Sequence, residues 1–407
     1  MSPYKNYLKI GYKPDFEKEV IATYSLLTED DFLEVAGGIA AESSIGTWTD
    51  VGTQEKERWE RLHARVFEAD KTSGLLKIAY PLALFEKGNI PQLLSAIAGN
   101  IFGLKEVERL RLLDLELPQS YVKSFPGPAF GPEGIREKTG VFDRPLIGSI
   151  IKPKLGLGTK GHVKVVMEVF EGGADFVKDD ENLTSQEFNK FEERVDGIMD
   201  NLRGEPKIYA FNVTAPVEIM LKRAEYVKEK GGNCVMIDFL TAGFAGLQEL
   251  RNKNYGLIIH GHRAMHAVFD KIPDHGISML VLAKLARLAG IDSLHTGTVV
   301  GKMEGGESEV TKINEFLLSS WKNLKKVLPV ASGGLHPALV PDLIKILGTD
   351  VLLNFGGGIH GHPRGSLAGV KAVCQAVEAT TKGLVLSSFA QNHEELRVAL
   401  ETWKEKP

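Results

Sequence analysis

The chain has 407 residues, of which 43% are hydrophobic and 25% are charged, a balance that excludes disordered and fibrous proteins. Lys and Arg total 49 against 53 Asp and Glu, so the net charge of −4 argues against a polyanion-binding surface, and we expect no nucleic-acid partner. Two cysteines are too few for a disulfide framework and indicate a cytoplasmic location. No apolar run is long enough to suggest a membrane partner.

The first 135 residues are predicted to form a small α+β domain. Thr28 is followed by three acidic residues and predicts the start of a helix, and residues 90–101 have helical spacing. The segment 125–134 is rich in Pro and Gly and predicts a linker, so we place the domain boundary between residues 135 and 136. The predicted strands of this domain are residues 19–27, 74–85 and 107–115.

After Arg144, short apolar runs alternate with helical segments. The eight runs are residues 146–151, 175–177, 207–212, 234–240, 256–260, 293–296, 328–331 and 351–355. The helix candidates are residues 161–171, 186–202, 217–230, 278–288 and 339–347. Eight buried strands over about 260 residues predict a (β/α)8 barrel. A doubly wound open sheet is the alternative, but it usually has fewer strands and a Gly-rich turn after its first.

The carboxyl ends of the predicted barrel strands carry most of the candidate chemistry. Residues two apart on a strand share a face, so Lys152 and Lys154 are expected to point the same way, as are Lys178 and Asp180. Asp180 and Glu181 supply hard oxygen ligands that suit magnesium. Two carboxylates make a weak site, and Lys178 would strengthen it only if neutralised or modified, for example to a carbamate. The alternative is a structural Lys–Asp ion pair beside two solvated acids.

Glycine runs after the last two predicted strands indicate an anion site. They lie at residues 332–334 and 356–358, where barrels commonly bind phosphate through exposed backbone N–H groups. Arg263 and Lys302 add side-chain donors. Two anion sites at one barrel mouth would suit a substrate with a phosphate at each end. The alternative is that the glycines only make tight turns.

Three further features are candidates for the same site. His262 and His295 follow barrel strands and are expected to transfer protons or to bind phosphate. Residues 301–306 place a lysine between glycines, which is typical of a lid, although an exposed loop would have the same composition. Trp48 is unusual in a turn and either lines a ligand pocket or packs in the core.

Taken together, these motifs resemble the large subunit of ribulose-1,5-bisphosphate carboxylase/oxygenase (RuBisCO). The resemblance runs from about residue 19 to about residue 390. It rests on the segments ESSIGTWT from Glu42, GNIFG with Asn100, IKPKLGL with Lys152 and Lys154, DFVKDDEN with Lys178, HGHRAMH with His262 and Arg263, GTVVGKMEG with Lys302, SGGLHP with Ser332, and FGGG at 355–358.

The resemblance implies an α/β fold, with a C-terminal TIM barrel after a small ferredoxin-like α+β domain. It implies enolisation, carboxylation and cleavage of ribulose 1,5-bisphosphate to two 3-phosphoglycerate, with oxygen competing with carbon dioxide. One Mg²⁺ per active site would be held by carbamylated Lys178, Asp180 and Glu181.

The resemblance also implies roles for single residues. The carbamate on Lys178 would help to take the C3 proton, and Lys302 on the closing loop would orient carbon dioxide. Lys152 would protonate the final carbanion, and Lys154 and His262 would assist proton transfer. Arg263 and His295 would bind one phosphate. The substrate-binding residues implied are Thr47, Trp48, Asn100, Arg263, His295, Ser332, Gly333, Gly334, Gly356 and Gly357.

Two N-terminal residues imply an oligomer. Glu42 and Asn100 reach the barrel of a partner subunit in this family, and Glu42 would pair with Lys302 when the loop closes. We therefore expect a homodimer or a ring of dimers, and no small subunit.

The short C-terminal tail and the GIHGHP segment at 358–363 resemble the archaeal (form III) enzymes, which act in nucleotide (AMP) salvage.

The nearest alternative is a RuBisCO-like protein that acts as a diketo-phosphate enolase or sugar-phosphate isomerase without carboxylation. Such proteins tend to lose the lid lysine, which is present here as Lys302. A second alternative is a silent sugar-phosphate-binding protein, which would not need that lysine.

Overall fold

The computed structural model describes residues 3–46, 53, 55–300 and 307–404. The chain divides into two compact units. One consists of Met1–Pro126 with Met265–Ala289, and the other of Gly127–Ala264 with Gly290–Pro407. No helix among the described residues has both the length and the apolar character needed to cross a membrane.

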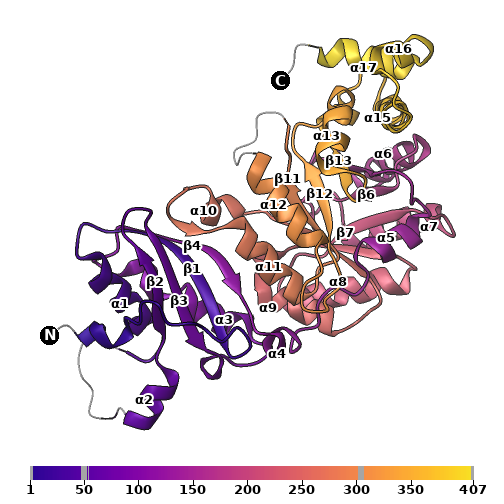
Figure 1. The fold of residues 1–407 in the computed structure, drawn as a ribbon. Coiled ribbons are helices and arrows are strands. Elements are labelled where there is room, and N and C mark those ends of the chain that lie inside the picture. The colour runs from indigo at the N-terminus through magenta and orange to yellow at the C-terminus, as the bar shows by residue number, and fades with distance from the viewer. Residues whose placement is uncertain (1–2, 47–52, 54, 301–306, 405–407) are drawn as a thin grey trace. The chain divides into compact units, whose positions relative to one another are not determined.

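The N-terminal unit is built on a five-stranded sheet with the order β10-β4-β1-β3-β2 (Figure 1). Its strands are β1 (Glu19–Leu27), β2 (Arg65–Asp70), β3 (Leu75–Pro81), β4 (Arg109–Glu116) and β10 (Gly276–Ile277). Its helices are η1 (Pro3–Tyr7), α1 (Phe32–Glu42), α2 (Lys56–Leu62), η2 (Leu82–Leu84), α3 (Ile90–Ile97), η3 (Asn100–Gly103), α4 (Gln119–Val122), α10 (His266–Asp270) and α11 (Met279–Ala289). The chain order β1-α1-β2-β3-α3-β4, with β1 between β4 and β3, confirms the ferredoxin-like prediction.

Helix α1 does not begin at Thr28 as predicted. Its N-cap is Asp31, whose carboxylate accepts a hydrogen bond from the Glu34 backbone N–H at 2.9 Å. The Thr28 hydroxyl instead donates to the Glu106 carbonyl at 2.7 Å and accepts from the Asp30 N–H. Because the hydroxyl is already used at the end of β1, the next available acceptor caps the helix.

The second unit is a closed barrel of eight parallel strands (Figure 1), as predicted. Its strands are β5 (Leu146–Ile150), β6 (Phe176–Lys178), β7 (Ile208–Asn212), β8 (Cys234–Asp238), β9 (Ile258–His262), β11 (Ser293–Gly297), β12 (Leu328–Ser332) and β13 (Leu352–Phe355). Strands β5 and β13 pair and close the ring. Fully buried residues such as Leu146, Phe176 and Ile258 fill the barrel core, which is why these strands read as nearly continuous apolar runs.

The helices of this unit lie before, between and after the barrel strands. They are α5 (Gly131–Thr139), α6 (Thr159–Glu171), α7 (Phe191–Leu202), α8 (Val217–Glu229), α9 (Phe239–Asn252), α12 (Glu307–Leu318), η4 (Pro337–Leu339), α13 (Val340–Leu347), α14 (Gly357–His360), α15 (Ser366–Thr381), α16 (Leu386–Phe389), η5 (Ala390–Asn392) and α17 (Glu394–Trp403). The predicted helices in this unit correspond to α6, α7, α8 and α13, and the predicted helix at 278–288 corresponds to α11.

The segment 125–134 contains the division between the two units, at Pro126 and Gly127, as its composition predicted, but its second half is not a linker. Helix α5 begins inside it, and the predicted domain boundary at residue 135 falls within that helix. The backbone N–H groups of Phe130 and Gly131 donate to Asp292 Oδ1 at 2.6 and 3.2 Å, and Phe130 packs against the barrel core. Gly131 has φ +63°, and a Cβ there would lie 2.6 Å from the Lys326 carbonyl oxygen. Close packing, rather than flexibility, therefore explains this glycine.

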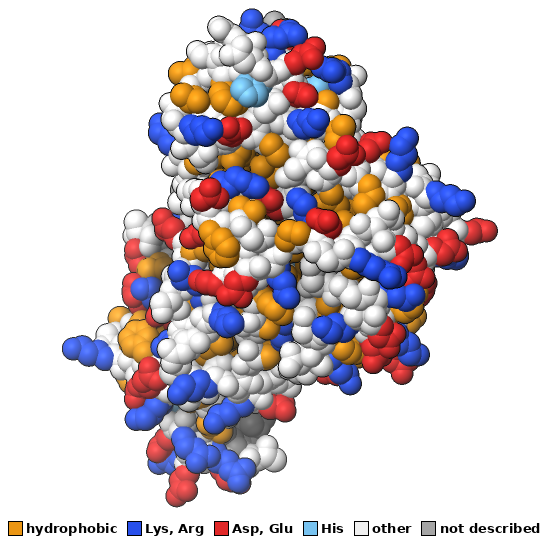
Figure 2. Space-filling model, turned by 90° about the vertical axis from the view of Figure 1, so that its right-hand side faces the viewer, with side chains coloured by type: hydrophobic (Ala, Val, Ile, Leu, Met, Phe, Trp, Pro, Cys, Tyr) orange, Lys and Arg blue, Asp and Glu red, His pale blue; other side chains and the backbone are white. Residues whose placement is uncertain are grey.

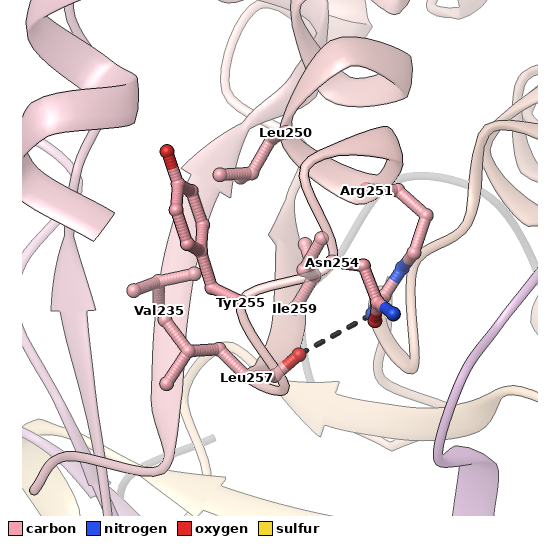
Figure 3. A pocket seen from close by; sticks show the side chains of 7 residues that line it. All are labelled: Val235, Leu250, Arg251, Asn254, Tyr255, Leu257 and Ile259. Atoms are coloured by element: carbon pink, nitrogen blue, oxygen red, sulfur yellow. Dashed lines mark hydrogen bonds between the residues drawn. The ribbon is translucent and has the colours of Figure 1, made fainter. Parts of the chain in front are cut away.

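A small pocket lies near the amino ends of β8 and β9 (Figure 3). Its lining includes Val235, Ile259 and Tyr255, and Arg251 donates to the Leu257 carbonyl beside it at 3.3 Å. His262, the predicted site residue on β9, lies at the carboxyl end of that strand, away from this pocket. On the face drawn in Figure 2, basic and acidic side chains are interspersed.

Candidate active site

Lys178 ends β6 and is buried, with 1% of its surface exposed. Its Nζ donates to the Asp179 carbonyl at 2.9 Å and lies 3.8 Å from Glu181 Oε2. Burial lowers the pKa of Lys178, although the carboxylates of Glu181 and Asp180 act in the opposite direction. A lowered pKa favours the neutral amine, which is the nucleophilic form of the side chain.

Asp180 is also buried, and it faces Lys152. Its Oδ2 accepts from Lys152 Nζ at 2.8 Å, and its Oδ1 accepts from the backbone and side-chain nitrogens of Asn182 at 3.0 and 3.1 Å. Burial alone would raise the pKa of Asp180, but the hydrogen bonds from Lys152 and Asn182 prevail and lower it. The Asp180 carboxylate is therefore ionised at neutral pH and available to a cation.

Asp179 points away from these groups and is fully buried. It accepts from the Tyr209 hydroxyl at 2.5 Å and the Asn212 N–H at 2.8 Å, and Arg194 Nε lies 3.1 Å from its Oδ1. The structural alternative, a Lys–Asp pair beside two solvated acids, does not describe this segment, because Asp179 and Asp180 are both shielded from solvent.

Asn212 is a residue that the sequence analysis missed. It ends β7, and its Nδ2 donates to the carbonyls of Asp180 at 3.4 Å and Glu181 at 3.0 Å. Its position in the sequence could have pointed to it, because it is the polar residue at the end of a predicted apolar strand.

His262, at the end of β9, is paired with a second missed residue. Its Nδ1 lies 2.6 Å from Asp238 Oδ1, and its Nε2 lies 3.6 Å from Glu181 Oε2. The Asp238 carboxylate accepts from Nδ1–H, which leaves Nε2 as the free nitrogen on the side of Glu181. This arrangement suits a proton-transfer group.

His295 belongs to a buried chain of hydrogen bonds. Its Nε2 lies 2.9 Å from Nε2 of His260, its Nδ1 lies 2.8 Å from the Ser332 hydroxyl, and His260 Nδ1 lies 2.8 Å from the Ser293 hydroxyl. Burial lowers the pKa of both histidines well below the ordinary value. Both rings are thus neutral, and one Nε2 donates to the other. Arg263 lies against the end of β11, since a Cβ on Gly297 would be 2.7 Å from its Nη2.

The two glycine segments have specific backbone requirements. Gly333 and Gly334 have φ of +107° and +66°, which favour glycine. Gly356 precedes α14, which begins at Gly357, and a Cβ on Gly356 would lie 3.6 Å from Lys152 Cε. A Cβ on Gly358 would lie 2.1 Å from the Leu335 carbonyl oxygen, so the loops after β12 and β13 touch.

The remaining predicted site residues lie elsewhere or are not described. Lys154 follows β5 with an exposed side chain. Glu42, at the end of α1, and Asn100, in η3, are exposed and belong to the N-terminal unit. The residues predicted at the site that fall outside the described part of the chain are Thr47, Trp48 and Lys302, together with the rest of 301–306.

In the described part of the chain, no three His, Cys, Asp or Glu side chains are grouped so that they could hold a metal ion. Asp180 and Glu181 are adjacent carboxylates, and Lys178 Nζ is close to Glu181. A carbamate on Lys178 would add the third anionic oxygen that this pair lacks, so these residues fit a magnesium ion only in that modified form.

Two family models match the chain. The model of the ribulose bisphosphate carboxylase large chain catalytic domain matches residues 133–403, and that of its N-terminal domain matches residues 6–121. The curated ribulose bisphosphate carboxylase of Methanocaldococcus jannaschii is 46% identical over 426 residues, covering 98% of this chain and 100% of that protein. That of Pyrococcus abyssi is 47% identical over 410 residues, covering 98% and 96%.

Solved structures agree with these matches. The octameric Rubisco of Pyrococcus horikoshii, in complex with sulfate, superposes with a TM-score of 0.95 at 46% identity, covering 99% of this chain and 97% of that one. A dimeric archaeal Rubisco from Hyperthermus butylicus gives a TM-score of 0.91 at 42% identity, covering 98% and 99%.

Proposed function

This chain belongs to the ribulose bisphosphate carboxylase large-chain family, and from that premise we propose that it carboxylates ribulose 1,5-bisphosphate and cleaves the product to two molecules of 3-phosphoglycerate. It is thus a carbon–carbon lyase of carbon fixation. The observation that carries the proposal is the buried Lys178 beside Glu181 and Asp180, with Lys152 bonded to that same aspartate.

We propose that carbon dioxide first carbamylates Lys178. The neutral Nζ forms an N–C bond to carbon dioxide and releases one proton. Carbamylated Lys178, Asp180 and Glu181 would then hold one Mg²⁺ per site. When bound, magnesium acts as a Lewis acid that polarises the carbonyl and hydroxyl oxygens of the substrate.

Proton transfer would involve four side chains of the barrel. Carbamylated Lys178 takes the C3 proton of the bisphosphate. Lys152 Nζ, held by Asp180 at 2.8 Å, protonates the carbanion left by cleavage. His262, oriented by Asp238, moves protons through Nε2, and Lys154 assists it.

Phosphate binding would use both sides of the barrel mouth. Arg263 and His295 bind one phosphate, and the loops at 332–334 and 356–357 bind the other through backbone N–H groups. Thr47, Trp48 and Lys302 would join the second site, with Lys302 also orienting carbon dioxide.

We also propose that Glu42 and Asn100 act in the active site of a partner subunit, so that the smallest active form is a homodimer. The neighbours described as dimeric and octameric support an assembly of this kind.

The test is incubation with ribulose bisphosphate, Mg²⁺ and labelled bicarbonate. We expect acid-stable label in 3-phosphoglycerate. Exchange of the C3 proton without fixed label would instead favour the enolase alternative, and no reaction at all would favour a silent binding protein.

We further propose that the substrate derives from nucleoside monophosphates such as AMP, as the archaeal resemblance suggests. Extracts of the source cells given AMP, phosphate and labelled bicarbonate should then form labelled 3-phosphoglycerate. If ribulose bisphosphate supports labelling in the same extract but AMP does not, the salvage assignment is wrong.

A further inference from the structure

We infer that Asp179 is a positioning residue which, with Tyr209, Arg194 and Asn212, fixes the segment that carries Lys178, Asp180 and Glu181 for activation by carbon dioxide and magnesium. The inference rests on the proposed function and concerns a residue that would not touch the metal or the substrate.

Asp179 directly follows the last residue of β6, and its side chain contacts residues of β7 and α7. There it meets a Tyr209 hydroxyl at 2.5 Å, the Asn212 N–H at 2.8 Å and Arg194 Nε at 3.1 Å. Both Asp179 and Arg194 have no exposed side-chain surface. The guanidinium of Arg194 therefore balances the charge of the carboxylate. Because the carboxylate is bonded from three directions, it has little freedom to rotate.

A second layer of contacts holds these partners. His162, on α6, lies 2.7 Å from the Tyr209 hydroxyl through Nε2. Because that hydroxyl donates to Asp179, it accepts from His162 Nε2–H. Arg194, on α7, also donates to Asn189 Oδ1 at 2.9 Å and to the Thr184 carbonyl at 2.7 Å. The carboxylate is thus tied to two helices, to β7 and to the loop between β6 and α7.

Asn212 connects this buried cluster to the predicted metal ligands. Its backbone N–H donates to Asp179, and its side-chain amide donates to the carbonyls of Asp180 and Glu181. A rotation of the segment that displaced either ligand would break bonds at Asp179 and Asn212 together. The network therefore fixes the backbone that carries both carboxylates before any cation arrives.

A buried ion pair that only stabilises the barrel would have the same burial, and the chain offers a matched control. Asp175 lies just before β6, at the opposite end of the strand, and accepts from both Arg144 Nη atoms at 2.7 and 3.0 Å and from the Ile147 N–H at 2.9 Å. Asp175→Asn should lower stability as Asp179→Asn does, without disturbing the segment from 178 to 181.

The experiment compares wild type with Asp179→Asn, Tyr209→Phe and Asp175→Asn. The ¹³C NMR signal of the lysine carbamate is followed at fixed pH and fixed ¹³CO2 while Mg²⁺ is titrated. We expect the Mg²⁺ midpoint to rise about 10-fold or more in Asp179→Asn, the range found for partners of metal ligands. In Tyr209→Phe, which removes only one of the bonds to Asp179, we expect a smaller rise of about 3-fold. Asp175→Asn should keep the wild-type midpoint, and the KM for ribulose bisphosphate at saturating Mg²⁺ should be unchanged in all variants that activate.

The outcomes separate this inference from the proposed function. Wild type without a carbamate signal would overturn both. A wild-type carbamate with unchanged Mg²⁺ midpoints in Asp179→Asn and Tyr209→Phe would overturn the positioning role alone, as would an equal shift in Asp175→Asn. If Asp179→Asn does not fold, the Mg²⁺ midpoint of Tyr209→Phe tests the positioning role. This variant removes one hydroxyl and leaves the ion pair between Arg194 and Asp179 in place.

Discussion

At the scale of single residues, Lys178 is a buried amine whose proposed role is to react with carbon dioxide. Its amine has 1% exposure and a lowered pKa, although carboxylates surround it. In water the same amine would be protonated at neutral pH and unreactive towards carbon dioxide. The barrel interior therefore lowers the pKa of this amine and also supplies the acidic neighbours that a cation would require.

Lys178→Ala should abolish Mg²⁺-dependent carboxylation and activation by carbon dioxide, because it removes the atom that carries the carbamate. Labelled-bicarbonate fixation measures the loss. Lys164→Ala, on the exposed face of α6, is the control and should fix label at the wild-type rate. Full turnover in Lys178→Ala would refute the carbamate role.

Asp238→Asn should lower kcat about 100-fold with little change in KM, because the neutral amide no longer orients and stabilises the His262 ring as a proton carrier. Steady-state kinetics at saturating Mg²⁺ measure kcat and KM separately. A raised KM with normal kcat would mean that His262 binds substrate rather than moving protons.

The sequence predicted roles for Lys178, Asp180 and His262 because each ends or follows an apolar run, but it did not point to Asp238. The run from 234 continues through Phe239 and Leu240, so the strand was predicted to extend two residues past its true end at Asp238. The apolar residues belong to the start of α9, and periodicity alone does not separate a buried strand from the buried helix that follows it. Asn212 was not predicted for another reason, because its role depends on the carbonyls of Asp180 and Glu181 in the loop after β6.

At the scale of elements, the loops after β12 and β13 act as one unit. Gly358 packs on the backbone of Leu335 and His336, and a Cβ there would lie 2.1 Å from the Leu335 carbonyl oxygen. Each loop therefore determines the position of the other, and so the direction of the N–H groups proposed to bind phosphate.

Gly358→Ala should separate these loops and raise the KM for ribulose bisphosphate about 10-fold or more, with a smaller effect on kcat. The control is Gly161→Ala on α6, where a Cβ meets only Leu157 Cδ2 at an ordinary 3.7 Å. That variant should be slightly more stable than wild type and kinetically normal. An unchanged KM in Gly358→Ala would contradict phosphate binding by these loops.

The sequence predicted the barrel strands well because each is buried on both faces and bounded by polar residues. It did less well where one residue type serves two purposes. The Pro and Gly residues of 125–134 predicted a linker, and the two units do divide there, but Gly131 also allows the backbone to approach the barrel wall closely. Local composition does not distinguish a turn from close packing.

At the scale of the whole molecule, several buried histidines should make stability depend on pH. Burial lowers the pKa of His162 and His360 to about 4, and it lowers the pKa of His260 and His295 well below the ordinary value. Below pH 6.5 the unfolded chain gains protons that the folded chain excludes, so stability is complete above that pH and falls as pH drops towards 4.

Each such histidine should reduce the unfolding free energy by about 1.4 kcal/mol per pH unit over this window. Urea denaturation at several pH values from 7.5 to 5 measures the slope. His360→Gln should show a shallower slope than wild type, by the contribution of one group. An identical slope would mean that His360 is protonated in the folded chain.

The proposed sharing of active sites between subunits predicts complementation. Glu42→Gln and Lys178→Ala should each be inactive, yet a hybrid dimer of the two contains one site with neither change. Co-expressed and purified hybrids should therefore show about half of the wild-type activity per dimer. Inactive hybrids would place both residues in the same subunit's site.

The short strand β10 has a consequence for biosynthesis. It adds to the edge of the N-terminal sheet, where Ile277 pairs with Leu112, and Lys284 on α11 donates to the Leu115 carbonyl. The residues of β1 to β4 leave the ribosome long before those of β10 are synthesised. The edge of β4 is therefore unpaired while about half of the barrel is made. Nascent chains paused before residue 276 should be more prone to aggregation and proteolysis than chains paused after 289. For the same reason, a gene fragment that stops at residue 126 should not yield a stable N-terminal domain.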